Sequence, residues 1–90
     1  MNLTINEKLQ LIDRTLQQLL ITQVNGVDIG AGAMGVHLMP EAMDNAFKHA
    51  KEMETHTTSK YPWQRIAIYN NIRFYAIYTQ EEWDRRRTNK

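Results

Sequence analysis

The chain has 90 residues, enough for one domain, and its 42% apolar and 23% charged residues are the balance of an ordinary globular protein. It has no cysteine, which excludes disulfides, thiolate nucleophiles and cysteine-based metal sites. No apolar run is long enough to span a bilayer, and the N-terminal residues lack the pattern of a signal peptide. We therefore expect a single cytoplasmic α+β domain, residues 1–90, that makes no contact with membranes.

The net charge of +1 is unevenly distributed along the chain. Residues 60–90 hold seven Lys and Arg against three Asp and Glu, whereas residues 1–59 hold four against seven. A basic C-terminal region suits an acidic protein partner or a phosphate group. The charge is small for a dedicated duplex-DNA-binding domain, for which a pI above about 9 is usual, so we do not expect duplex DNA as a partner.

A first amphipathic helix is predicted near the N-terminus. Thr4 and Glu7 have the spacing of a capping box, which marks a helix start. Apolar residues then follow at alternating steps of four and three: Ile5, Leu9, Ile12, Leu16 and Leu19. Asn25-Gly26 can end this helix in a left-handed conformation, or it can be the turn of a hairpin between residues 22–24 and 27–29. We favour the helix end, because the helical pattern is the longer of the two.

A glycine-rich loop is predicted next, leading into a short strand over residues 36–39. Gly30, Gly32 and Gly35 have the spacing of the dinucleotide-binding fingerprint, but that motif needs a helix directly after the glycines. Here an extended segment follows, and the chain is too short for a doubly wound sheet. A turn is the ordinary interpretation, and a loop whose backbone amides hold a phosphate is the alternative. In that alternative the candidate ligand-binding residues are Gly30, Gly32, Gly35, His37 and Arg73.

A second amphipathic helix is predicted from Pro40, which is well tolerated at a first helical position, to about Glu54. Its apolar face would be Met43, Ala46, Phe47, Ala50 and Met53. The polar residues 55–59 would then end it.

The C-terminal half predicts a two-residue β-hairpin, in which Asn70-Asn71 joins the strands 63–69 and 72–78. The expected pairs are Tyr69 with Ile72, Ala67 with Phe74, Arg65 with Ala76, and Trp63 with Tyr78. The other face of the hairpin carries Ile66, Ile68, Tyr75 and Ile77, with Gln64 and Arg73. Because both faces are largely apolar, we expect helices on one face and a helix, a second subunit or a partner on the other. A homodimer is the first expectation, or a higher homo-oligomer.

A short C-terminal helix is predicted after a second capping box, Thr79 to Glu82. This region combines aromatic and arginine side chains, which form hot spots in protein interfaces and also stack on the bases of single-stranded nucleic acids. The ordinary interpretation is that the aromatic residues form the core and that the arginines complement the helix dipole. The candidate partner-binding residues are Trp63, Arg65, Tyr78, Trp83, Arg85, Arg86 and Arg87.

Nothing in the sequence has the spacing of a catalytic or metal site. The histidines His37, His49 and His56 match no metal-binding motif, and Glu54, His56 and Ser59 lie side by side in a polar loop, the wrong setting for preorganised catalysis. We therefore expect no enzyme, no metal and no cofactor.

Taken together, the elements predict an α+β domain of order α–β–α–β–β–α: a small antiparallel sheet centred on the C-terminal hairpin, packed by two amphipathic helices, with a short C-terminal helix. Residues 35–79, with Gly35-Val36-His37-Leu38-Met39-Pro40-Glu41, Tyr61-Pro62-Trp63 and the hairpin, resemble the layout of small accessory proteins of phages and prophages of Gram-positive bacteria. The resemblance implies a viral protein in the host cytoplasm that acts by binding. The leading hypothesis is a non-enzymatic inhibitor of a host defence factor, as in anti-CRISPR proteins, working by protein–protein contact. The alternatives are a nucleotide-binding sponge that holds a phosphate-containing signal at the glycine-rich loop and a subunit interface, and a single-stranded nucleic-acid-binding protein.

Overall fold

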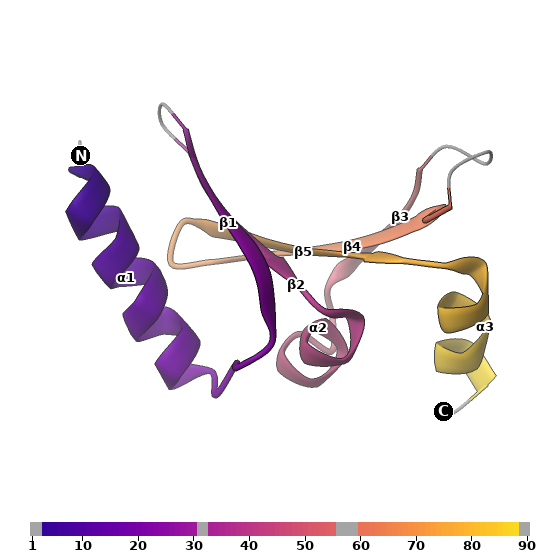
Figure 1. Cartoon of the computed structure of the whole chain (residues 1–90). Helices are drawn as coiled ribbons and strands as arrows, with labels where there is room; N and C mark the ends of the chain where they lie inside the picture. Colours follow the sequence, from indigo (N-terminus) through magenta and orange to yellow (C-terminus); the bar gives the residue numbers. More distant parts are fainter. Residues whose placement is uncertain (1–2, 31–32, 56–59, 89–90) are drawn as a thin grey trace.

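The computed structural model describes residues 3–30, 33–55 and 60–88 and has an α+β fold, as predicted. Five strands form one sheet in the order β1-β2-β5-β4-β3, and the helices lie on one side of it (Figure 1). All neighbouring strands are antiparallel, as predicted for the sheet around the hairpin, except β2 and β5, which are parallel. The elements are α1 (Ile5–Gln18), β1 (Val24–Gly30), β2 (Ala33–Leu38), α2 (Pro40–Ala46), β3 (Lys51–Glu54), β4 (Trp63–Tyr69), β5 (Ile72–Tyr78) and α3 (Gln80–Thr88).

Helix α1 begins at the predicted capping box but ends earlier than expected. The backbone N–H of Glu7 donates to the Thr4 hydroxyl, and the Glu7 carboxylate accepts from the Thr4 N–H. The helix ends in a Schellman motif, in which the Ile21 N–H donates to the Leu16 carbonyl at 2.9 Å and the Leu20 N–H donates to the Gln17 carbonyl at 3.2 Å. Leu20 stands in the left-handed position of this motif, with φ 57°.

The segment after α1 forms a strand that neither sequence interpretation predicted. Asn25 and Gly26 neither end the helix nor form a turn: they lie inside β1, at an irregularity of its pairing with β2. The two strands pair from Val24 with Leu38 to Gly30 with Ala33, so Gly30 and Gly35 belong to strands and not to a free loop. Because pairing supplies the backbone hydrogen bonds, it overrides the low strand propensity of glycine.

Helix α2 is half as long as predicted, and residues 51–54 form the edge strand β3 instead. The Arg65 guanidinium accounts for part of this difference, because it donates to the carbonyls of Phe47 and Lys48, at 3.0 and 3.2 Å, where the helix ends. Residues 51–54 then pair with the free edge of β4, from Lys51 with Ile66 to Glu54 with Trp63.

The C-terminal hairpin is confirmed with its predicted register. Asn70 and Asn71 both have positive φ, 53° and 63°, as a two-residue turn of this kind requires. The predicted capping box of α3 is also present: the Glu82 N–H donates to the Thr79 hydroxyl, and the Thr79 N–H donates to the Glu82 carboxylate.

The core lies between the sheet and the helices. The central strand β5 buries every second side chain on this side, and the core consists of Ile12, Ile21, Met34, Val36, Leu38, Met43, Ile72, Phe74, Ala76, Tyr78 and Trp83. In the described ranges, no helix covers the opposite side of the sheet, which we call the outer face (Figure 1). Among these residues there is also no helix that is long and apolar enough to cross a membrane.

Candidate partner-binding groove

An open groove of about 1140 Å³ lies on the helix side of the sheet, between α2 and α3. Its walls come from the two helices and the segments beside them, and its floor includes Arg65 of β4 and Tyr78 of β5. Small-molecule pockets usually measure about 300–1,000 Å³ and are more enclosed. The size and openness of the groove therefore suit a segment of another chain better than a small ligand.

The floor of the groove is a buried ionic network. Arg65 is only 2% exposed, and its Nη1 donates to Oδ1 of Asp44 at 2.6 Å. The same Asp44 oxygen accepts from the Tyr78 hydroxyl at 2.8 Å. Burial, followed by the hydrogen bond to Asp44, raises the pKa of Tyr78 well above its ordinary value, so this phenol remains a donor. The network fixes α2 to the centre of the sheet.

Arg86 joins this network from α3. Its Nε donates to Asp44 at 3.2 Å, its Nη2 contacts the Glu52 carboxylate, and its guanidinium lies 4.7 Å from the ring centroid of Trp83. One arginine thus connects α3 with α2, with β3 and with the aromatic core. These contacts set the width of the groove.

Stacked aromatic rings hold α3 against the sheet. The rings of Trp63 and Trp83 are parallel within 4°, with centroids 4.8 Å apart, and Tyr78 meets Trp83 edge-on. The indole N–H of Trp63 donates to the side-chain oxygen of Gln80 at 3.0 Å. Pairs of this kind contribute about 0.5–1.5 kcal/mol beyond the area they bury.

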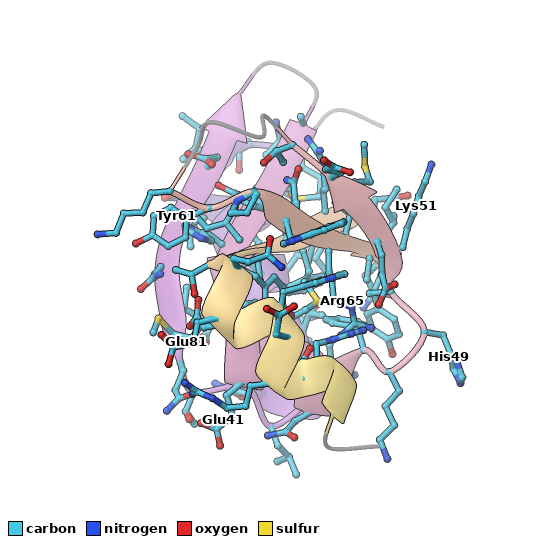
Figure 2. All side chains as sticks on the ribbon, turned by 90° about the vertical axis from the view of Figure 1, so that its right-hand side faces the viewer. Glu41, His49, Lys51, Tyr61, Arg65 and Glu81 are labelled. Carbon is cyan, nitrogen blue, oxygen red and sulfur yellow. The ribbon has the colours of Figure 1, made fainter. Side chains whose placement is uncertain are left out.

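The predicted partner-binding residues fall into two groups. Arg65, Tyr78 and Trp83 are buried and Trp63 is half-buried, so their side chains mainly pack the chain's own core. Arg85 and Arg86 line the groove, where Arg85 forms an exposed ion pair with Glu81 of the same helix. Figure 2 looks onto α3 and shows Arg65 and Glu81 on opposite sides of this helix in the view. The side chain of Arg87 lies outside the described part of the structure.

Sequence reasoning missed Asp44, Lys48 and Glu52. Lys48 follows α2 and lines the groove, and the two carboxylates are the counter-charges of the arginines. The sequence did contain a sign that an acidic partner was needed. The predicted hairpin register placed Arg65 in an apolar strand opposite Ala76, where its side chain would be buried. A buried arginine requires a buried acidic partner.

The predicted ligand-binding residues do not line the groove. The pairing of β2 with β5 places Gly35 beside Arg73, and His37 beside Tyr75, on the outer face. Gly30 lies at the end of β1, where its carbonyl accepts from Lys8 Nζ at 3.4 Å, and Gly32 lies outside the described residues. The structure thus brings together three of the five predicted residues: Gly35, His37 and Arg73.

An aromatic pair stands beside these three residues. The rings of His37 and Tyr75 stack with centroids 4.8 Å apart and planes 6° from parallel. The Tyr75 hydroxyl donates to Asp28 at 2.9 Å, and burial together with this carboxylate raises the pKa of Tyr75. Among the residues that the structure describes, no group of three His, Asp or Glu side chains could hold a metal ion. His49 points outward in Figure 2, and His56 and Ser59 lie outside the described residues.

No family model matches this chain, and no curated protein or solved structure is similar to it.

Proposed function

We propose that this chain is a non-enzymatic binding protein whose α2–α3 groove receives an acidic segment of a partner protein. The observation that carries the proposal is the pair of cations on the two sides of the groove, Lys48 after α2 and Arg85 on α3. A segment lying in the groove would pass between them. Complementary charges of this kind favour encounter and register more than raw affinity.

The groove residues differ in how readily they can accept a new partner. Arg65 and Arg86 hold the buried network and are committed to Asp44 and Glu52. Arg85 pairs with Glu81 on the exposed surface of one helix turn, an interaction worth about 0.3–0.5 kcal/mol. A partner's carboxylate can replace Glu81 at little cost, whereas the fixed floor keeps the groove open before binding.

Besides Asp44, two further acidic residues line the groove, and they limit where a partner's carboxylates can lie. Glu82 is occupied as the cap of α3, where it accepts from the Thr79 N–H. Glu41 lies in the first turn of α2. A partner segment would therefore place its acidic residues toward Lys48 and Arg85 and its neutral residues toward Glu41.

The resemblance to phage accessory proteins adds a prediction about the partner. It implies that the partner is a host factor, and that occupying its acidic segment blocks its activity. This part of the proposal rests on the resemblance and not on the groove.

The test is capture of the partner with the tagged full-length chain, followed by binding measurements with the purified pair. The double variant Lys48→Glu/Arg85→Glu should lose the partner by tenfold or more in affinity. The matched control, Arg14→Glu/Lys60→Glu, makes the same change of charge at exposed residues outside the groove and should bind normally. If the groove variant keeps the same partner with the same affinity, the groove is not the binding site.

A nucleotide-binding sponge is the second candidate, because Gly35, His37 and Arg73 meet on the outer face. Arg73 would hold a phosphate, and the His37–Tyr75 pair would stack on a base. Native mass spectrometry of the purified chain tests this directly, since a bound nucleotide adds a few hundred daltons per site. Base stacking by Tyr78 or Trp83 is not supported, because both rings are buried in the core.

A further inference from the structure

We infer that the outer face of the sheet is a homodimer interface, with two copies packed face to face across a two-fold axis parallel to β5. This inference goes beyond the proposed function, because it concerns the side of the sheet away from the groove. It accounts for a large apolar surface that the described helices leave uncovered (Figure 1).

The half of the face formed by β5, β4 and β3 is a ridge of bulky side chains. Ile68 is 74% exposed, although isoleucine is among the residues most often buried in proteins. The pairing registers place Ile66 opposite Tyr75 and next to Lys51, on the same side as Ile68. Ile77 and Met53 extend the ridge along the same strands.

The half formed by β1 and β2 is a hollow beside this ridge. Two of its outward positions are glycines, Gly26 and Gly35, which have no side chain. A Cβ added at Gly26 would meet nothing within 4 Å, so the hollow is open above this residue, whereas a Cβ at Gly35 would meet the Asp28 side chain at 3.6 Å and the Tyr75 ring at 3.8 Å.

The strand order makes the ridge and the hollow complementary in two copies. In the order β1-β2-β5-β4-β3, turning a second copy about an axis along the central strand β5 lays its β1–β2 half on the β4–β3 half of the first. The registers align Gly35, Arg73 and Ile68 in one row across the sheet. The two-fold therefore places Ile68 of each copy over Gly35 of the other, where it would pack against the Tyr75 ring and the Asp28 side chain that flank this glycine.

The charges at the edges agree with the same arrangement. Asp28 lies on β1 and Lys51 lies on β3, at opposite edges of one chain. Figure 2 shows the Lys51 side chain pointing away from the helices. By the same registers, the two-fold lays Lys51 of one copy over Gly26 of the other, two residues along β1 from Asp28, twice per dimer. Arg73 lies near the axis, and its guanidinium lies 6.0 Å from the ring centroid of Tyr75 in its own chain.

The area is sufficient for a reversible dimer. Five strands about 4.8 Å apart, up to seven residues long at about 3.3 Å each, give a footprint of roughly 500 Å² per copy. The total of about 1,000 Å² is at the lower limit of specific interfaces, so we expect a dimer that dissociates on dilution.

The test is sedimentation equilibrium of the full chain over a series of concentrations. The mass should rise toward twice the 10.6 kDa of the chain as the concentration increases and fall on dilution, because an interface at the lower size limit is reversible. Ile68→Lys should remain monomeric. Ile5→Lys is the matched control, since Ile5 is 66% exposed on α1 and away from the outer face, and it should dimerise normally. Circular dichroism of each variant checks that it is folded.

A charge exchange tests the orientation of the two copies. Asp28→Lys and Lys51→Asp should each weaken the dimer at least fivefold, and the double variant should recover most of the loss. The Tyr75–Asp28 hydrogen bond within one chain is not restored in the double variant, so recovery can only come from contacts between copies. A monomer at every concentration, a dimer that tolerates Ile68→Lys, or a double variant without recovery would overturn the inference. None of these results affects the groove, whose variants are scored by partner binding.

Discussion

Replacing Asp44 by alanine should be among the most destabilising single changes in this chain. The substitution leaves the Arg65 guanidinium, 2% exposed, without its counter-charge, and it also removes one acceptor each from Tyr78 and Arg86. Breaking a buried pair in this way costs about 3–5 kcal/mol. Asp44 itself is partly exposed, so water can enter beside Arg65, and we expect a loss of about 3 kcal/mol. In a domain of this size, that lowers the Tm by about 12–24 °C.

Urea unfolding followed by tryptophan fluorescence measures this loss, because Trp63 and Trp83 stack on each other beside the network. Glu41→Ala, at an exposed position of the same helix, is the control and should change the free energy of unfolding by less than about 0.5 kcal/mol. Adding Arg65→Met to Asp44→Ala should recover part of the loss, since a methionine needs no counter-charge. If Asp44→Ala costs less than about 1 kcal/mol, the buried pair does not hold α2 to the sheet and this reasoning is wrong.

Three further changes follow from local geometry. Leu20→Gly should raise the free energy of unfolding by about 1 kcal/mol, because Leu20 is 87% exposed and adopts a positive φ that glycine adopts without strain. Leu20→Ala should give no such gain, and thermal unfolding of the two variants distinguishes them. Asn71→Gly should stabilise the β4–β5 turn by about 0.5 kcal/mol in the same assay, since both turn residues have positive φ, and a destabilised variant would show that the Asn71 side chain has another role. Because the pKa of Tyr78 is raised in the folded chain, the unfolded chain loses this proton first as the pH rises above about 10, so the free energy of unfolding should fall there. In urea titrations at alkaline pH, the free energy of unfolding of Tyr78→Phe should fall less steeply with pH. Equal slopes for the two chains would contradict the raised pKa of Tyr78.

The parts of the fold that depend on neighbouring residues were predictable from the sequence. The Thr4–Glu7 and Thr79–Glu82 capping boxes and the Asn70-Asn71 turn are short-range patterns, and each is present as expected. The register of β4 with β5 followed from the turn length. In each case the residues that interact are within a few positions of the turn or cap, so local chemistry determines the structure.

The parts that were missed depend on pairing between distant segments. β3 forms because β4 has a free edge, and its sequence, Lys51-Glu52-Met53-Glu54, also continues the helical pattern of α2. β1 contains Asn25-Gly26, a typical turn pair, and becomes a strand through β2, which pairs in parallel with β5. No local pattern encodes these contacts.

The residues of the candidate site were predictable from the sequence, but their burial was not, because burial also depends on contacts between distant segments. The arginines and aromatic residues of the C-terminal region stood out in composition, but whether each is buried depends on α2, which packs beside them through Asp44. Arg65 therefore became part of the floor, whereas Arg85 remained at the edge of the groove.

The two proposed surfaces lie on opposite sides of one sheet, and this arrangement has a functional consequence. A dimer built on the outer faces leaves both grooves open, because each groove lies on the helix side of its own sheet. The two-fold axis points the grooves in opposite directions, so one dimer can hold two partner molecules or two segments of an oligomeric partner. Linking two sites in this way can raise the apparent affinity by about 10²–10⁴ without any new contact, provided that the partner can reach both. Ile68→Lys should then weaken binding to an oligomeric partner while it leaves the affinity of a single groove unchanged, and binding to a monomeric partner should not respond.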